Sequence, residues 1–178
     1  RLTYADILNA ARAGAQIIRE AGVKYVGLLD VNSPVVPVAL FAAAYAGVPY
    51  VPMNYRLTKL ELEALLGRIA PALLISDAAV LAPLHVPTGV QVMLRDEFQR
   101  VALASQPEAM SAPGEPHDTA IQLFTSGTTG KPKGAVHVHE AVVVHHSSAA
   151  AVFGLHGGDV FWCTADPGWV TGTSYGIL

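Results

Sequence analysis

The sequence predicts an α/β fold with a mostly parallel sheet that helices cover. Short apolar runs of strand length alternate with segments of helical periodicity through the first part of the chain. The connections between these segments are short, which favours right-handed crossovers between parallel strands. One run, residues 25–31, is apolar along most of its length, as expected for a strand buried on both faces.

The first predicted helix has clear signals at both ends. Thr3, with Asp6 three residues later, is typical of a capped helix start, and Gly22 ends the helical pattern. Further elements follow in order along the chain. We expect strands at residues 25–31, 48–52 and 72–76, and helices at residues 37–46 and 59–69.

The pattern weakens between residues 80 and 118, where prolines and glycines interrupt the chain. One strand is expected at residues 90–94. The polar stretch at residues 105–118 is predicted to be a surface connection without chemistry of its own.

Beyond this connection, residues 119–124 and 135–138 are predicted strands, and residues 140–153 a packed helix. We therefore divide the chain into a first α/β part (residues 1–104), the connection (residues 105–118) and a second part (residues 119–178). The composition suggests an incomplete domain, because 52% of the residues are hydrophobic and only 14% are charged. Some apolar surface is expected to be covered by polypeptide outside this sequence.

Charge and cysteine content exclude several classes of protein. Eleven basic and fourteen acidic residues give a net charge of −3, so no general field directs the chain to nucleic acid or to an acidic membrane. The single cysteine, Cys163, excludes an internal disulfide framework and fits a cytoplasmic protein.

Residues 31–55 contain no charged side chain and imitate a membrane span in length. Four prolines and Gly47 divide this stretch into a short helix and a separate strand. Neither part could cross a bilayer core of roughly 30 Å, so both are expected to be buried elements of the fold.

The most informative stretch is TSGTTGKPKG at residues 125–134, which joins two predicted strands. Its glycine backbone, hydroxyl groups and two lysines suit a polyphosphate. A Walker A loop is excluded, because Gly127 and Gly130 are too close together and Pro132 follows Lys131.

The longer string FTSGTTGKPKGA, residues 124–135, resembles the phosphate-loop signature of the AMP-forming adenylating enzymes. This family includes acyl-CoA synthetases, luciferases and the adenylation domains of peptide synthetases. Phe124 and Ala135 replace the family's frequent tyrosine and valine. Residues 2–6 and 51–58 also resemble landmarks of the family's N-terminal domain, and residues 159–178 are similar to acetyl-CoA synthetases in particular.

The resemblance implies that a carboxylate attacks the α-phosphate of ATP, which gives an acyl adenylate and pyrophosphate, and that the thiol of coenzyme A then displaces AMP. It assigns Lys133 a catalytic role and Thr125 a role in holding Mg²⁺. The implied ATP-binding residues are Thr125, Ser126, Gly127, Thr128, Thr129, Gly130, Lys131 and Lys133. Such chemistry depends on positioning and on stabilisation of phosphate charge.

By the same resemblance, Trp169, Val170 and Thr171 line the acyl site. A bulky indole in that wall excludes long acyl chains, so a short acid such as acetate or propionate is expected. Residues 1–77, however, are more similar to medium- and long-chain acyl ligases, which leaves a ligase for longer or aryl acids as an alternative.

A third possibility is a non-catalytic nucleotide-binding or interaction module. The sequence contains no counterpart of the family's adenine-binding and ribose-binding motifs, nor of the C-terminal domain with its catalytic lysine. The 178-residue chain is therefore expected to be inactive by itself.

Four histidines follow the glycine-rich stretch, at positions 137, 139, 145 and 146. The zinc pattern H-E-x-x-H fails because Val143 occupies the position of the second histidine. Structural roles are therefore expected for these side chains.

Overall fold

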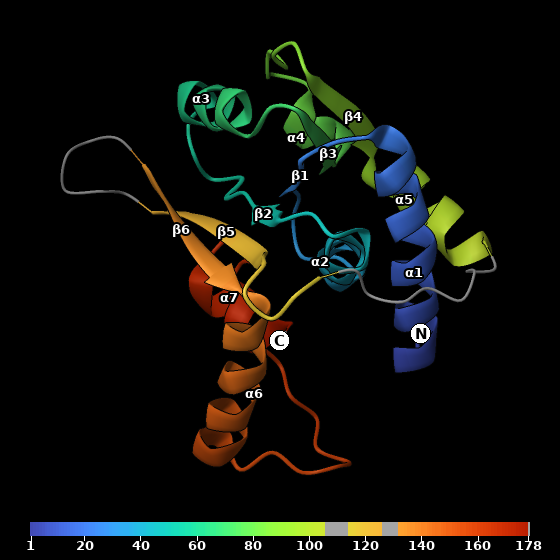
Figure 1. Ribbon diagram of the computed structural model, residues 1–178, viewed down its shortest axis with the longest axis vertical. Coiled ribbons are helices and arrows are strands. Elements are labelled where there is room, and N and C mark those ends of the chain that lie inside the picture. Colours follow the sequence, from blue (N-terminus) through green and yellow to red (C-terminus); the bar gives the residue numbers. More distant parts are fainter. Residues whose placement is uncertain (106–113, 126–131, 178) are drawn as a thin grey trace.

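The computed structural model describes residues 1–105, 114–125 and 132–177. Within them the strands form a six-stranded sheet of order β4-β3-β1-β2-β5-β6 (Figure 1). The strands are β1 (Tyr25–Leu29), β2 (Tyr50–Pro52), β3 (Ala72–Ser76), β4 (Val90–Leu94), β5 (Thr119–Thr125) and β6 (Lys133–Val138). All neighbouring strands are parallel except β5 and β6, which are antiparallel. The predicted mostly parallel α/β fold is confirmed.

Seven helices lie in the described part of the chain. They are α1 (Tyr4–Ala21), α2 (Val35–Ala46), α3 (Lys59–Ile69), α4 (Ala78–Leu81), α5 (Arg95–Ala104), α6 (His139–Phe153) and α7 (Val170–Gly176).

Helices cover both faces of the sheet because side chains alternate along its strands. Leu73 of β3 belongs to a hydrophobic cluster with α1, α2 and α5, and its neighbour Leu74 belongs to a second cluster with α3. All residues of β2 and β3 are buried, as expected for central strands of a covered parallel sheet.

The predicted start and end of α1 are confirmed. Thr3 Oγ1 accepts a hydrogen bond from the Asp6 backbone N–H at 3.1 Å, and Asp6 Oδ2 accepts one from the Thr3 backbone N–H at 2.7 Å. The backbone hydrogen bond from Thr3 lowers the pKa of Asp6. Gly22 ends the helix with φ of 63°, in the left-handed region where glycine is favoured.

Helix α2 begins at Val35, two residues before the predicted start at Pro37. A proline in the first turn of a helix is tolerated, because its missing N–H would have no intrahelical partner there. The uncharged stretch does form a buried helix and a buried strand, α2 and β2, as predicted. In the described residues, no helix combines the length and the hydropathy that crossing a membrane requires.

Helix α5 has no counterpart in the prediction, and neither do the short helices α4 and α7. The sequence of α5, RDEFQRVALA, is polar and places only Phe98 and Ala102 in the core. Arg95, at its start, bonds Asp30 at 3.1 Å and Asp77 at 3.0 Å. These contacts join α5 to the residues that follow β1 and β3.

Strands β5 and β6 form the edge of the sheet that carries the glycine-rich stretch. The antiparallel register pairs Thr125 with Lys133 and Phe124 with Gly134. The glycine-rich stretch was predicted to join two strands, and both of its ends do lie in paired strands. Helix α6 continues from β6 and extends away from the sheet (Figure 1), and none of its residues is buried.

Candidate functional site

The hairpin of β5 and β6 brings two of the predicted phosphate-binding residues together. Thr125 and Lys133 are directly opposite each other in the register, so their side chains project from the same face of the hairpin. Both residues are exposed. The other predicted members, Ser126, Gly127, Thr128, Thr129, Gly130 and Lys131, lie outside the described residues.

Arg68 and Gln122 lie close to the end of the hairpin. A Cβ atom added to Gly134 would lie 2.7 Å from Gln122 Nε2, the end of a flexible side chain. Arg68 of α3 contacts β5 and the residue directly before β6. Its guanidinium lies 4.7 Å from the centre of the Phe124 ring, and its Nη1 donates a hydrogen bond to the Pro132 carbonyl.

A cavity of about 220 Å³ adjoins Thr125. Trp169 and Val170 line the same cavity, together with Met53, Asn54 and side chains of α3, β5 and the residues before α3. The structure therefore places two of the three predicted acyl-site residues beside Thr125, the first of the predicted phosphate-binding residues. The third, Thr171, is exposed in the first turn of α7 and is not among the described residues that line this cavity.

Trp169 stands at the end of a tight turn that leads into α7. The Trp169 backbone N–H donates to the Asp166 carbonyl at 3.1 Å, and Thr173 Oγ1 donates to the Pro167 carbonyl at 2.8 Å. A Cβ atom on Gly172 would lie 1.8 Å from the Asp166 carbonyl oxygen, so the turn requires glycine at that position.

The turn is docked on the segment between β2 and α3. A Cβ atom on Gly168 would lie 2.6 Å from Asn54 Cα and 2.7 Å from the Met53 carbonyl oxygen, which shows how closely the two backbones approach. Arg56 Nε bonds Asp166 Oδ2 at 2.7 Å. This hydrogen bond raises the pKa of Arg56.

Sequence reasoning assigned no role to Arg56, Arg68 or Asp166. Residues 51–58 were identified only as a segment similar to the family. The available signal for Arg56 was its place in that segment, but its partner Asp166 is 110 residues further along the chain. Nothing local in the sequence connects the two.

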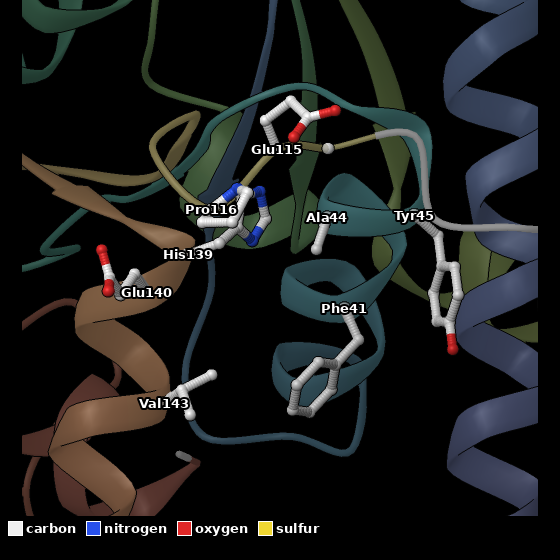
Figure 2. Close-up of a pocket in the computed structure, with 9 residues that line it drawn as sticks. Phe41, Ala44, Tyr45, Glu115, Pro116, His139, Glu140 and Val143 are labelled. Atoms are coloured by element: carbon white, nitrogen blue, oxygen red, sulfur yellow. The ribbon is translucent and has the colours of Figure 1, made fainter.

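A larger cavity of about 590 Å³ lies between α2 and α6, with Phe41 and Val143 on opposite sides (Figure 2). Glu115, His139 and Glu140 also line it, but none of the predicted site residues does. The site is therefore identified by the convergence of Thr125, Trp169 and Val170 and not by cavity size.

The histidines of the second part occupy different elements. His137 lies in β6, whereas His139 is the first residue of α6, so the two do not lie on one strand. His145 Nε2 lies 3.0 Å from the Ser174 carbonyl oxygen, and its ring centre is 4.9 Å from that of Tyr175. His145 thus joins α6 to α7. Within the described residues, no group of three or more potential metal-binding side chains gathers.

Comparisons with known proteins show which proteins the chain is similar to. The chain is 57% identical over 61 residues to acetyl-coenzyme A synthetase of Bacillus subtilis, a match that covers 34% of this chain and 11% of the relative. It is 44% identical over 88 residues to acetyl-coenzyme A synthetase of Salmonella typhimurium, covering 49% and 13% of the two chains. The matched regions thus span only about an eighth of these relatives.

Two solved structures resemble the fold along nearly the whole chain. The N-terminal domain of FACL13 from Mycobacterium tuberculosis has a TM-score of 0.88 at 26% identity, covering 99% of this chain and 47% of that one. A benzoate CoA ligase from Burkholderia xenovorans has a TM-score of 0.85 at 25% identity, covering 97% and 37%. The family model described as AMP-binding enzyme matches residues 1–178. The chain belongs to the family of AMP-binding enzymes.

Proposed function

We propose that this chain is part of an AMP-forming acyl-CoA ligase that activates a short carboxylic acid such as acetate or propionate. The observation that carries the proposal is the position of Thr125, which is paired with Lys133 on one side and lines the cavity beside Trp169 on the other. A phosphate-binding hairpin end and an acyl pocket would then meet at one residue. Their junction is where a carboxylate must approach the α-phosphate of ATP.

The described residues suit a polyphosphate. Lys133 supplies an ammonium group and Thr125 a hydroxyl group, both exposed on one face of the hairpin end. In this proposal Lys133 stabilises the negative charge of the departing pyrophosphate, and Ser126, Gly127, Thr128, Thr129, Gly130 and Lys131 hold the phosphates with it.

The Thr125 hydroxyl is also an oxygen ligand of the kind that Mg²⁺ accepts. We assign it as one protein ligand of that ion, which supplies positive charge next to the phosphates when bound. Coenzyme A is the proposed thiol substrate, and it releases AMP by attack on the acyl carbonyl.

The expected preference for a short acid depends on Trp169. Its indole borders the cavity next to Thr125, where it would limit the length of an acyl chain whose carboxylate points toward the phosphates. Val170, beside it, contributes a second apolar surface, and Thr171 follows in the first turn of α7. A wall of this size acts by steric exclusion, which discriminates more strongly than the few kcal/mol that an extra methylene contributes in an open pocket.

A ligase for longer or aryl acids is the second candidate. Trp169 is 57% exposed, so it closes the cavity only in part. The fold is also similar to that of a benzoate CoA ligase. Activity of the enzyme on a series of acids separates the two candidates.

We further propose that activity requires more polypeptide than these residues. The relatives are several times longer, and α6 presents Val143, Val144 and Val152 to solvent, each more than 60% exposed. In the proposal, other parts of the same enzyme cover this apolar surface. In this proposal the 178-residue chain alone would be inactive. The alternative is a chain that binds nucleotide and has no catalytic role in any longer form.

Product analysis tests the reaction. A longer polypeptide that carries these residues together with the family's remaining motifs should form pyrophosphate when ATP and an acid are present, and should release AMP in steady turnover only when coenzyme A is present as well. Formation of ADP and phosphate, or ATP cleavage that does not depend on the acid, would contradict the proposal.

A further inference from the structure

We infer that Arg56 is a positioning residue for acyl-chain selectivity, which it controls by holding the turn that carries Trp169. The inference rests on the proposed function, because selectivity has meaning only if the cavity beside Thr125 binds the acid. The inference adds Arg56 to that function. Arg56 would act through Trp169, which lies 113 positions later in the sequence.

The first step is the ion pair itself. Arg56 Nε and Asp166 Oδ2 lie 2.7 Å apart, and the Asp166 side chain is only 14% exposed while that of Arg56 is 65% exposed. The guanidinium also lies 5.1 Å from the centre of the Tyr55 ring, which restricts its position. Arg56 therefore presents a fixed donor to a largely buried carboxylate.

The second step leads from Asp166 to Trp169. The carbonyl oxygen of Asp166 accepts a hydrogen bond from the Trp169 N–H at 3.1 Å. Asp166 therefore accepts one hydrogen bond from Arg56 with its side chain and another from Trp169 with its backbone. A displacement of Asp166 would therefore move the backbone of Trp169 directly. Between them, Gly168 packs against the backbone of Met53 and Asn54.

The third step concerns the cavity. Asn54 and Trp169 both line it, and Arg56 lies two residues after Asn54, where the Arg56 N–H donates to Asn54 Oδ1 at 2.9 Å. The ion pair thus joins two segments that line the same cavity. Loss of the pair would let the turn that carries Trp169 shift, which would admit longer acids.

The contact between Gly168 and Asn54 would keep the turn near its place even without the ion pair. The expected effect of losing Arg56 is therefore a change in selectivity and not a loss of the fold.

The test compares Arg56→Met with Arg56→Lys in the longer polypeptide that shows acid-dependent activity. The measured quantity is the ratio of kcat/KM for acetate to kcat/KM for hexanoate. We expect Arg56→Met to lower this ratio by about tenfold, the effect of one or two methylenes in a hydrophobic pocket, and Arg56→Lys to restore part of it.

Lys59→Met is the matched control, because it removes a similarly exposed ion pair nearby in the sequence. This pair joins Lys59 and Glu63, which are one helical turn apart in α3, at 3.7 Å. This control should leave the ratio within twofold of the wild type. An unchanged ratio in Arg56→Met, or an equal change in Lys59→Met, would overturn the inference.

A second measurement follows the turn directly in the 178-residue chain. The Trp162→Phe background leaves Trp169 as the only tryptophan, because the sequence has two. Arg56→Met should increase acrylamide quenching of Trp169, and Lys59→Met should not. Equal quenching in both variants would overturn the positioning role, whereas a wild-type enzyme that prefers hexanoate would refute the proposed short-acid function instead.

Discussion

Thr125 and Lys133 face each other across β5 and β6. The antiparallel register fixes this relationship, because a shift by one residue would turn one of the two side chains to the opposite face. Phe124 and Gly134 form the next pair down the hairpin. The sheet edge therefore determines where the hydroxyl and ammonium groups of the proposed phosphate site project.

Lys133→Ala should reduce acid-dependent ATP cleavage strongly. The variant loses an ammonium group at the place where the proposal puts pyrophosphate charge, so we expect kcat/KM to fall by about 10²- to 10³-fold. Lys24→Ala is the control, since Lys24 is exposed just before β1, distant in sequence from the hairpin. An equal loss in both variants would point to a general effect of charge and would contradict the assignment.

Trp169→Ala should change the preferred acid and not the reaction. Removal of the indole enlarges the cavity beside Thr125, so kcat/KM for butyrate and hexanoate should rise relative to that for acetate by at least about tenfold. Kinetics with acids of increasing length would measure the shift. Trp162→Ala, at a side chain that is 83% exposed, should leave the preference unchanged.

Gly168→Ala should destabilise the 178-residue chain. The added methyl group would meet backbone atoms of Asn54 and Met53 at 2.6 to 2.8 Å, which forces the turn away from the segment before α3. Overpacking of this kind costs about 1–3 kcal/mol. Urea unfolding provides the measurement.

Gly67→Ala is the matched comparison, because its added methyl group in α3 would have no neighbour within 4 Å. It should be neutral or should stabilise the chain by up to about 1 kcal/mol, since alanine is the better helix former. If Gly168→Ala were as stable as Gly67→Ala, the close docking of the turn would be wrong.

The capping box of α3 should give a stability difference that depends on pH. Glu61 accepts hydrogen bonds from the Thr58 side chain and backbone, at 2.7 and 2.8 Å, and the side-chain hydrogen bond is the main cause of the lowered pKa of Glu61. A lowered pKa in the folded state means that the stabilisation is present above the pKa of the unfolded chain, about 4.3, and is lost as the pH falls through the folded value.

Thr58→Ala should therefore lower Tm by about 2–4 °C at pH 7, and the difference should shrink below about pH 4. Thermal unfolding from pH 3 to pH 8 would show it. In a Glu61→Gln background most of the pH dependence of the Thr58→Ala effect should disappear. A difference that grows toward low pH would contradict the assigned hydrogen bonds.

The order of elements could be predicted from sequence because the relevant signals are local. The first four residues of β3 are all apolar, and α1 has its cap residue Thr3 directly before it and Gly22 directly after it. The fold class follows from such signals repeated along the chain.

Helix α5 was missed because its burial depends on distant residues. Phe98 is fully buried, and its ring would lie 2.8 Å from a Cβ atom on Gly14 of α1, so a small residue 84 positions earlier makes room for it. The polar sequence around Phe98 gives no sign of this contact. Arg56 could not be identified for the same reason, because only the fold brings its partner Asp166 next to it.

The two motifs of the candidate site could be predicted from the sequence, but their meeting at one cavity could not. The glycine-rich stretch and the residues around Trp169 stand out in sequence as two separate motifs. Their meeting at one cavity depends on β5 pairing with β2 and on the turn docking against Asn54, which are long-range contacts.

Acid-dependent exchange of pyrophosphate into ATP is the most direct measurement of the central claim. We expect no exchange by the 178-residue chain, and we expect exchange that requires a short acid and Lys133 in a polypeptide extended through the family's remaining motifs. Robust exchange by the 178-residue chain alone, or its absence from the extended polypeptide with every acid, would contradict the proposed function.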